Sequence, residues 1–336
     1  MPGPDPHAIA VVGAGSWGTA LAIHLARSGH PTVLWGRDRA ALAEMRAERR
    51  NRRYLPRAAF PAALQVETDL DAALAAARDV LVAVPSHAFR ETLNALQSRL
   101  GANARVAWAT KGFEIETGLL PHHVAAELLG ARPTAVLSGP TFASEVAADL
   151  PTALVVASLD ARFGEALAQR LSGPNFRAYR QTDVVGVEVG GAVKNVIAIG
   201  SGLSDGLGFG ANTRVALITR GLAEMLRLGV RLGATRETFM GLAGLGDLVL
   251  TCTDDQSRNR RLGIALAQGQ SFDAAASAIG QVVEGVHAAR AVRRVAERVG
   301  VEMPICEQVY RIVHEGHDAR ESVRLLMRRA LRAESD

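Results

Sequence analysis

The chain has 336 residues, of which 48% are hydrophobic and 21% are charged, and its formal net charge is +4. This length and apolar content suit an ordinary globular protein of about two domains, each with a packed core. The positive charge favours an anionic small substrate, whereas an aromatic content of 4% and scattered arginines argue against a nucleic-acid-binding protein.

Cysteine usage and the start of the chain narrow the class further. Only Cys252 and Cys306 occur, which excludes a disulfide framework and offers no metal-ligand spacing, so no metal is expected. The first residues lack the basic stretch of a secretory signal, and the apolar run 8–12 ends at a glycine. No uninterrupted apolar segment approaches the length of a membrane span. We therefore expect a cytoplasmic protein without an integral membrane segment.

Short apolar runs alternate with helix-like segments in the first half of the chain. This rhythm is typical of βαβ units and of a parallel sheet buried on both faces. Helices are expected at 18–28, with Gly29 as the cap, and at 70–77, with Asp69 as the N-cap. The expected strands are residues 8–12, 32–35, 80–84, 106–109, 135–137, 153–157 and 176–179.

The pattern changes near Gly186, after which the periodicity is helical and no strand is expected. The sequence therefore predicts an α/β protein with two domains. Residues 1–185 should form a Rossmann-type domain with a doubly wound, mostly parallel sheet, and residues 186–336 an all-helical domain that binds the substrate.

A GxGxxG pattern follows the first expected strand and opens a helix, with Gly13, Gly15 and Gly18 as its glycines. In this context the glycines allow a tight turn, close approach of a pyrophosphate and close packing of helix on strand. The free N–H groups of the helix terminus face the anion. The pattern therefore predicts dinucleotide binding, in which Trp17 could cover the pyrophosphate or simply fill the seam between helix and sheet.

The second expected strand, 32–35, is followed by Gly36, Arg37 and Asp38, at the position where this type of domain contacts the ribose of its cofactor. Arg37 can pair with a ribose 2′-phosphate, so NADPH is the expected cofactor. In the alternative, Arg37 is a surface residue, Asp38 binds the ribose and NAD is favoured. The arginine-rich stretch 46–57 is interpreted as the solvated end of a helix and the loop after it.

Only two of the 38 basic side chains are lysines, Lys111 and Lys194, and chance is the alternative explanation of their survival. A desolvated lysine, unlike an arginine, can exchange a proton with a substrate. Lys194 is the candidate for that proton, with Asn195 placed to orient a hydroxyl or a water. The small residues 190–192 would let the backbone approach cofactor or substrate. Alternatively, Lys194 extends its amine from the end of a helix into solvent.

Asp247 is the one carboxylate in the glycine-rich stretch 241–248, which is expected to be a loop. A buried carboxylate needs a partner, and Lys194 is the expected one, since their pairing would direct the ammonium and hold its pKa up. The alternative is that Asp247 caps the helix that follows.

Ser257, Arg258 and Asn259 stand beside a helix expected to begin near Arg260. A hydroxyl, a guanidinium and an amide at a helix start suit a phosphate group. Alternatively, Arg260 and Arg261 are the anion partners, or all the arginines of this run are solvated.

Taken in order, these motifs resemble the bacterial NAD(P)-dependent sn-glycerol-3-phosphate dehydrogenase family. The likeness extends over almost the whole chain. It rests on the segments GAGSWGTALA, VAVPSH, ATKGFE, LSGPTFASEV, VEVGGAVKNVIAIGSG, GLAGLGDLVLTC, SRNRRLG and GQVVEG.

The resemblance implies an oxidoreductase that interconverts sn-glycerol 3-phosphate and dihydroxyacetone phosphate with NADP or NAD and feeds phospholipid synthesis. It implies that Lys194 is the general acid or base on the C2 oxygen and that Lys111 contacts both substrate and cofactor. The other implied substrate contacts are Gly139, Thr141, Asp247, Ser257, Arg258 and Asn259. The implied cofactor contacts are Ser16, Trp17, Arg37, Ala143, Arg258, Val282 and Glu284.

Two other functions fit parts of the pattern. A β-hydroxyacid or ketopantoate type reductase would share the two-domain plan and could bind a carboxylate at Ser257–Asn259. A nucleotide-sensing regulator would bind NAD(P) without turnover, but it leaves both lysines unexplained. In each case the apolar faces of the helical domain favour a homodimer.

Overall fold

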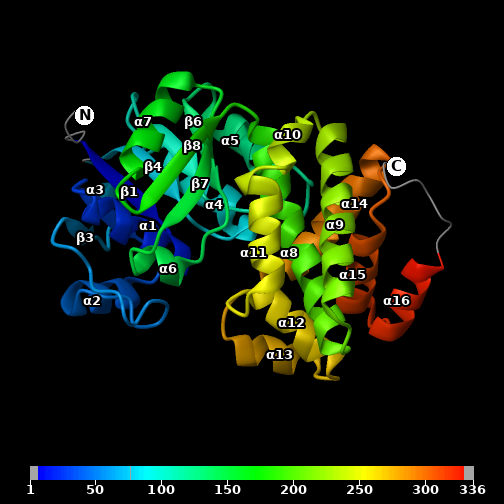
Figure 1. The fold of residues 1–336 in the computed structure, drawn as a ribbon. Coiled ribbons are helices and arrows are strands. Elements are labelled where there is room, and N and C mark those ends of the chain that lie inside the picture. The colour runs from blue at the N-terminus through cyan, green and yellow to red at the C-terminus, as the bar shows by residue number, and fades with distance from the viewer. Residues whose placement is uncertain (1–6, 76, 329–336) are drawn as a thin grey trace.

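The computed structural model describes residues 7–75 and 77–328. One sheet lies in the first half of the chain (Figure 1). Its strand order is β3-β2-β1-β4-β5-β6-β7-β8. All neighbouring strands are parallel except β6 and β7. The strands are β1 (Ala8–Val12), β2 (Thr32–Trp35), β3 (Leu64–Val66), β4 (Ala77–Val82), β5 (Arg105–Trp108), β6 (Thr134–Ser138), β7 (Thr152–Ala157) and β8 (Phe176–Gln181).

Alternate residues of β1 show why the sheet is covered on both faces. Ile9 and Val11 pack in one apolar cluster with α1 (Ser16–Arg27) and α7 (Ala161–Leu171). Ala10 and Val12 pack in another with α4 (Phe89–Gln97) and α5 (Pro121–Leu129). Successive side chains of a strand point to opposite faces, so a fully apolar strand needs helices on both. The helices of this domain are α1 (Ser16–Arg27), α2 (Arg39–Glu48), α3 (Leu70–Ala75), η1 (Ser86–Ala88), α4 (Phe89–Gln97), α5 (Pro121–Leu129), α6 (Ala143–Ala147) and α7 (Ala161–Leu171).

The structure confirms the predicted fold class and corrects three details of the elements. Strand β3 was missed, because three residues with an exposed Gln65 in the middle give too short a pattern to recognise. The helix predicted at 70–77 is shorter, since α3 ends at Ala75 and Ala77 already belongs to β4; residue 76 lies outside the described residues. Helix α1 begins two residues earlier than predicted, at Ser16.

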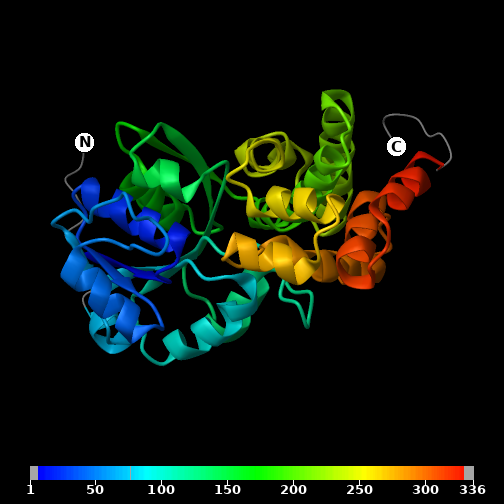
Figure 2. The same cartoon turned by 90° about the horizontal axis from the view of Figure 1, so that it is seen from below.

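Helices alone make up the described second half, which forms a separate lobe beside the sheet domain (Figure 2). Its centre is α8 (Val184–Gly206), whose Val189, Val193, Val196 and Ile197 are fully buried in one apolar cluster. The remaining elements are α9 (Ala211–Arg231), α10 (Arg236–Phe239), η2 (Leu242–Gly246), α11 (Asp247–Thr253), α12 (Arg258–Ala267), α13 (Phe272–Ile279), α14 (Glu284–Val299), α15 (Pro304–Glu315) and α16 (Ala319–Met327).

Helix α8 is also the one described helix that is long and apolar enough to cross a membrane. Its sequence is interrupted by Glu188 and Lys194, so it is not the uninterrupted apolar segment whose absence was expected. Because 89% of its most apolar window is buried inside the protein, α8 is explained as the core helix of its domain.

The passage between the domains is short. Strand β8 ends at Gln181, and Asp183 caps α8 by accepting a hydrogen bond from the Gly186 N–H at 2.8 Å. The same carboxylate accepts a bond from Thr238 Oγ1 at 2.6 Å, which ties the start of α8 to α10. The predicted boundary between residues 185 and 186 falls in the first turn of this helix and stays a prediction.

Candidate functional site

Two adjoining cavities lie where the sheet domain meets the helical domain. The larger, of about 750 Å³, lies over the start of α1, and the smaller, of about 270 Å³, lies beside α8 and α11. Ser16, Trp17 and Arg258 line both cavities, so the two are continuous. We refer to them as the nucleotide cavity and the substrate cavity.

The start of α1 has the shape that a dinucleotide requires. Gly13 has a φ of +122°, and a Cβ there would lie 2.4 Å from the Ala83 oxygen. A Cβ on Gly18 would lie 1.9 Å from the Gly13 oxygen, whereas one on Gly15 would meet nothing within 4 Å. Gly15 is the N-cap of α1 and offers no side-chain acceptor, so the first N–H groups of the helix remain available to an anion. These residues fit a pyrophosphate.

Most residues expected to contact the cofactor line the nucleotide cavity, but three do not. Gly18 lies beneath the cavity and packs α1 on the turn before it. Lys111 and Ala143 line the substrate cavity instead. The expected residues that do line the nucleotide cavity are Gly13, Gly15, Ser16, Trp17, Arg37, Arg258, Val282 and Glu284.

The arginine-rich stretch 46–57, which comprises the end of α2 and the loop after it, is more than a solvated surface. Arg46 Nε donates to the Val66 carbonyl at 2.8 Å, and Arg49 Nη1 donates to the Leu64 carbonyl at 2.7 Å, so both hold the edge strand β3 in place. Arg52 and Arg53 line the nucleotide cavity together with Tyr54.

This loop was missed as part of the cofactor site. The loop is attached by Asn51, which is fully buried and whose Nδ2 donates to the Ala14 carbonyl at 3.1 Å and to Thr19 Oγ1 at 2.9 Å. Those bonds join the loop directly to the glycine-rich turn. In the sequence, the one hint of them is a polar, uncharged residue among arginines, and that hint does not by itself predict the bonds.

Arg37 is available to a ligand at the edge of the nucleotide cavity. Its side chain is 71% exposed, and its ion pair with Glu91 is long, at 3.6 Å. Such exposed pairs contribute little, so a phosphate could displace it. Asp38 lines the same cavity, and its Oδ1 accepts a hydrogen bond from the Ala41 N–H at 3.0 Å as the N-cap of α2.

The substrate cavity gathers side chains from segments that are far apart in the sequence. Gly139 does not line the substrate cavity. Its carbonyl accepts hydrogen bonds from two residues that do, Lys111 Nζ at 3.4 Å and Thr141 Oγ1 at 3.3 Å. The expected substrate residues that line it are Lys111, Thr141, Lys194, Asp247, Ser257, Arg258 and Asn259.

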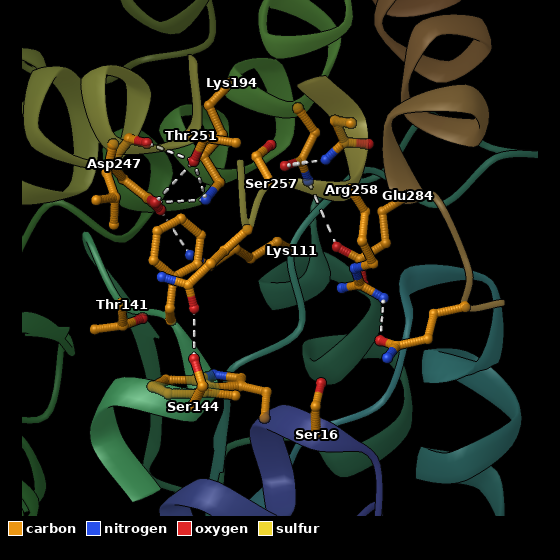
Figure 3. A pocket seen from close by; sticks show the side chains of 18 of the residues that line it. Ser16, Lys111, Thr141, Ser144, Lys194, Asp247, Thr251, Ser257, Arg258 and Glu284 are labelled. Carbon is orange, nitrogen blue, oxygen red and sulfur yellow. Dashed lines mark hydrogen bonds and ion pairs between the residues drawn. The ribbon is translucent and has the colours of Figure 1, made fainter. Parts of the chain in front are cut away.

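Two ammonium groups share one buried carboxylate in the lining of this cavity (Figure 3). Lys111 Nζ lies 2.6 Å from Asp247 Oδ2, and Lys194 Nζ donates to Asp247 Oδ1. Lys194 also donates to Thr251 Oγ1 at 3.0 Å, and that hydroxyl donates to the Asp247 carbonyl at 2.6 Å. Lys111 comes from the loop after β5, so the carboxylate also joins the two domains.

The predicted partnership of Lys194 and Asp247 is confirmed, and Asp247 raises the pKa of Lys194 as predicted, but burial of the amine outweighs it. Burial is the largest influence and, although Asp247 opposes it, lowers the pKa of Lys194 to about 8, with the nearby charge of Lys111 acting in the same direction. Burial raises the pKa of Asp247, but the two ammonium groups outweigh it and leave that pKa below its ordinary value. The carboxylate therefore stays ionised while the amine can titrate near neutrality.

Lys194 is buried because it lies in the middle of α8, the core helix of its domain. The side chain is only 7% exposed, which excludes the alternative of a lysine at a helix end extending into solvent. The small residues before it serve packing and not ligand approach, because a Cβ on Gly190 would lie 2.3 Å from the Ala243 oxygen of η2. The glycine-rich stretch is itself a π-helical turn that leads into α11, not a loop.

The start of α12 is arranged differently from the expectation. The helix begins at Arg258, and Ser257 is its N-cap, with Oγ accepting from the Arg260 N–H at 3.2 Å. The Asn259 amide is buried and donates to Asn195 Oδ1 at 2.9 Å, while its oxygen accepts from the Gly285 N–H at 2.9 Å. Only Arg258 of the three reaches across both cavities, where it donates to the Val282 carbonyl at 2.8 Å.

The neighbouring Arg260 and Arg261 lie in different environments. Arg260 is buried and pairs with Asp205 at 2.7 Å and with Asp255, so it is not an anion partner for a ligand. Arg261 lines the substrate cavity and forms no ion pair within the described part of the chain.

Helices α8 and α12 touch backbone to backbone. A Cβ on Gly202 would lie 2.0 Å from the Arg260 oxygen, and one on Gly263 would lie 2.1 Å from the Ile199 oxygen.

Comparison with known proteins gives a family match over both domains. The family model described as NAD-dependent glycerol-3-phosphate dehydrogenase N-terminus matches residues 8–164, and the corresponding C-terminus model matches residues 183–324. Two relatives named glycerol-3-phosphate dehydrogenase [NAD(P)+] are similar over almost the full length. The one from Edwardsiella ictaluri is 60% identical, covering 97% of each chain, and one from Yersinia pestis is 58% identical, covering 98% of each chain.

The fold is similar to that of a solved relative. The crystal structure of glycerol-3-phosphate dehydrogenase from Coxiella burnetii superimposes with a TM-score of 0.94 at 49% identity and covers 96% of this chain and 99% of its own. At this identity the likeness includes the arrangement of both domains.

Proposed function

The chain belongs to the NAD-dependent glycerol-3-phosphate dehydrogenase family, and from this premise we propose how its residues carry out the reaction. The reaction is the reversible reduction of dihydroxyacetone phosphate to sn-glycerol 3-phosphate with NADPH or NADH. The family match decides against the hydroxyacid-reductase and sensor alternatives. The observation that supports the mechanism is the buried cluster of Lys194, Lys111 and Asp247 beside the nucleotide cavity.

Lys194 is the proposed proton donor. When bound, the nicotinamide supplies the hydride for the ketone carbon. As an ammonium, Lys194 stabilises the negative charge that develops on the C2 oxygen and then protonates it. Asp247 and Thr251 occupy N–H groups of the ammonium and so fix the direction of the remaining one. In the oxidative direction the same amine must be neutral to accept the proton, which its lowered pKa permits.

The phosphate of the substrate is proposed to bind at the start of α12. Arg258 reaches the junction of the two cavities, and Arg261 lies one turn further along the same helix. The hydroxyl of Ser257 uses an acceptor position in capping α12 and still has its proton to donate. Two guanidinium groups and a hydroxyl suit a dianionic phosphate better than a carboxylate.

NADPH is the proposed preferred cofactor. Arg37, Arg52 and Arg53 all line the nucleotide cavity, and Arg37 comes two residues after the end of β2. Three arginines there favour a ribose carrying a 2′-phosphate, whereas Asp38 alone would favour an unphosphorylated one.

Two further proposals concern the setting of the enzyme. A homodimer is supported by exposed apolar side chains on and beside α9, such as Val215 and Met240. A cytoplasmic location is supported by the two cysteines, both of which are free and buried.

The central test is the steady-state rate with dihydroxyacetone phosphate, measured separately with NADPH and NADH. We expect turnover with both cofactors and a lower KM for NADPH. An unphosphorylated ketoacid at the same concentration is the control and should give no comparable rate. A faster reaction with the ketoacid would overturn the proposed phosphate site.

A further inference from the structure

One exposed side chain joins the two domains beside the substrate cavity and takes no part in the mechanism above. Gln256 lies in the turn between α11 and α12. Its Oε1 accepts a hydrogen bond from Ser144 Oγ at 2.5 Å, and its Nε2 donates to Glu145 Oε1 at 2.9 Å. Ser144, on α6 of the sheet domain, points into the cavity opposite the helical domain (Figure 3). A single amide therefore bridges the two walls of the substrate cavity.

The sheet-domain end of this bridge is rigid. Val146 and Ala147 of α6 are buried in the same apolar cluster as α1, and Arg27 Nη2 of α1 donates to the Ala147 carbonyl at 2.7 Å. Helix α1 is the one whose N-terminus faces the nucleotide cavity. The anchor of Gln256 is thus fixed to the nucleotide-binding helix.

The helical-domain end is equally constrained. The Gln256 N–H donates to Asp254 Oδ1 at 2.7 Å, and the Ser257 N–H donates to the Asp254 carbonyl at 3.2 Å, which closes a tight turn. The turn continues into α12, whose backbone touches α8 at Gly202 and Gly263. Since both ends are stiff, the amide bridge constrains how far Ser257 and Arg258 stand from the opposite wall, in addition to the Lys111–Asp247 pair that also joins the domains.

We propose that Gln256 is a positioning residue for the substrate: it holds the start of α12 at the distance from α6 at which Arg258 and Ser257 can bind the phosphate. This inference rests on the proposed function of those two residues. Gln256 lines the substrate cavity but not the nucleotide cavity. Among the described residues its side chain hydrogen-bonds to Ser144 and Glu145, and not to Lys111, Lys194 or Asp247. Its loss should therefore act mainly on substrate binding, because Ser257 lines the substrate cavity alone, and should change proton transfer and cofactor binding much less.

The first test is Gln256→Ala, with the KM for dihydroxyacetone phosphate, kcat and the Kd for NADPH measured on the full-length enzyme. We expect the KM to rise about three- to tenfold, as for the loss of one or two exposed hydrogen bonds, with kcat and Kd within about twofold of wild type. Gln169→Ala is the matched control, since Gln169 Nε2 donates to Glu165 Oε1 at 2.8 Å on α7 and lines neither cavity.

The second test exchanges the two ends of the bridge. Gln256→Glu alone places two carboxylates opposite each other and should raise the KM more than Gln256→Ala does. Combining it with Glu145→Gln restores a carboxylate and an amide across the gap and should bring the KM back toward wild type. Rescue would support positioning through this contact. An unchanged KM in Gln256→Ala, or additive effects in the exchanged pair, would overturn it. The wild-type rate reports on the proposed function, whereas the KM ratio reports on Gln256 alone.

Discussion

The nucleotide cavity and the substrate cavity adjoin each other but are built in opposite ways. The first is shaped mainly by backbone, in a turn of six residues from Gly13 to Gly18, where the glycines create space and helix α1 offers its N–H groups. The second depends on side chains, with Asp247 lying 53 residues from Lys194 and 136 from Lys111 along the chain. Changes in the first region should therefore alter affinity for the cofactor, and changes to the lysine–carboxylate cluster of the second should alter turnover and its pH dependence.

The largest expected effect separates these two regions. Lys194→Arg keeps a positive charge but removes a proton that can be transferred, because a guanidinium does not titrate in this range. We expect kcat to fall by about 10²- to 10⁴-fold, the usual range for loss of a general acid, while the Kd for NADPH stays within about twofold. Rapid-mixing turnover and fluorescence titration measure the two quantities. A variant with a near-normal rate would exclude Lys194 from proton transfer.

The next change acts on the pKa of the same amine. In the wild type, ketone reduction needs the ammonium and should slow as the pH rises through about 8, whereas glycerol 3-phosphate oxidation needs the neutral amine and should speed up. Asp247→Asn removes the charge that raises this pKa, so both transitions should move to lower pH. At pH 8 the rate of reduction should fall by at least about tenfold.

The pH profiles of both directions check this prediction. Thr251→Val is a useful comparison, since it removes a neutral hydrogen-bond partner of Lys194 and leaves the carboxylate in place. If Asp247→Asn moved the transition to higher pH, the assigned role of the carboxylate would be wrong.

A smaller effect is expected from the nucleotide side. Gly15→Ala adds a methyl group that meets no protein atom within 4 Å, so Tm should not change. The same methyl stands where a pyrophosphate must approach, and we expect the Kd for NADPH to rise about tenfold, a loss of about 1.4 kcal/mol. Gly18→Ala is the contrasting variant: its methyl would collide with the Gly13 oxygen and should lower Tm. Equal Tm losses in both would contradict this division of roles.

The smallest expected effect concerns cofactor choice. Arg37→Ala should raise the KM for NADPH about three- to tenfold and leave the KM for NADH nearly unchanged, because only NADPH carries the 2′-phosphate. The exposed Arg162→Ala is a suitable control for loss of one surface charge. Equal changes with both cofactors would mean that Arg37 does not read the phosphate and that Asp38 sets the preference.

Local signals in the sequence predicted the nucleotide end well. The glycine spacing and the apolar runs are set by neighbouring residues, so a doubly wound sheet with a dinucleotide turn could be inferred directly. Strand β3 was not predicted because its three residues have no recognisable pattern. They are held as a strand by pairing with β2 and by hydrogen bonds from Arg46 and Arg49. Arg52 and Arg53 were misread for a related reason: the buried Asn51 that directs their loop is recognisable only in three dimensions.

At the chemical end, residue identity was predictable but electrostatics was not. The scarcity of lysine pointed to Lys111 and Lys194, and the lone carboxylate pointed to Asp247. The sign of the pKa change at Lys194 depends on how burial compares with charge, and that balance is decided by packing around α8. In the same way, the inward turn of Asn259 toward Asn195 follows from the contact between α8 and α12 and not from its place in the motif.

That contact between α8 and α12 has a consequence for substrate selection. With glycine at positions 202 and 263, the two backbones meet with no side chain between them that could compress or slide. The Lys194 amine on α8 and the Arg258 guanidinium on α12 are therefore held at a fixed separation. A molecule one carbon shorter or longer between its carbonyl and its phosphate would contact one of these groups and fail to reach the other.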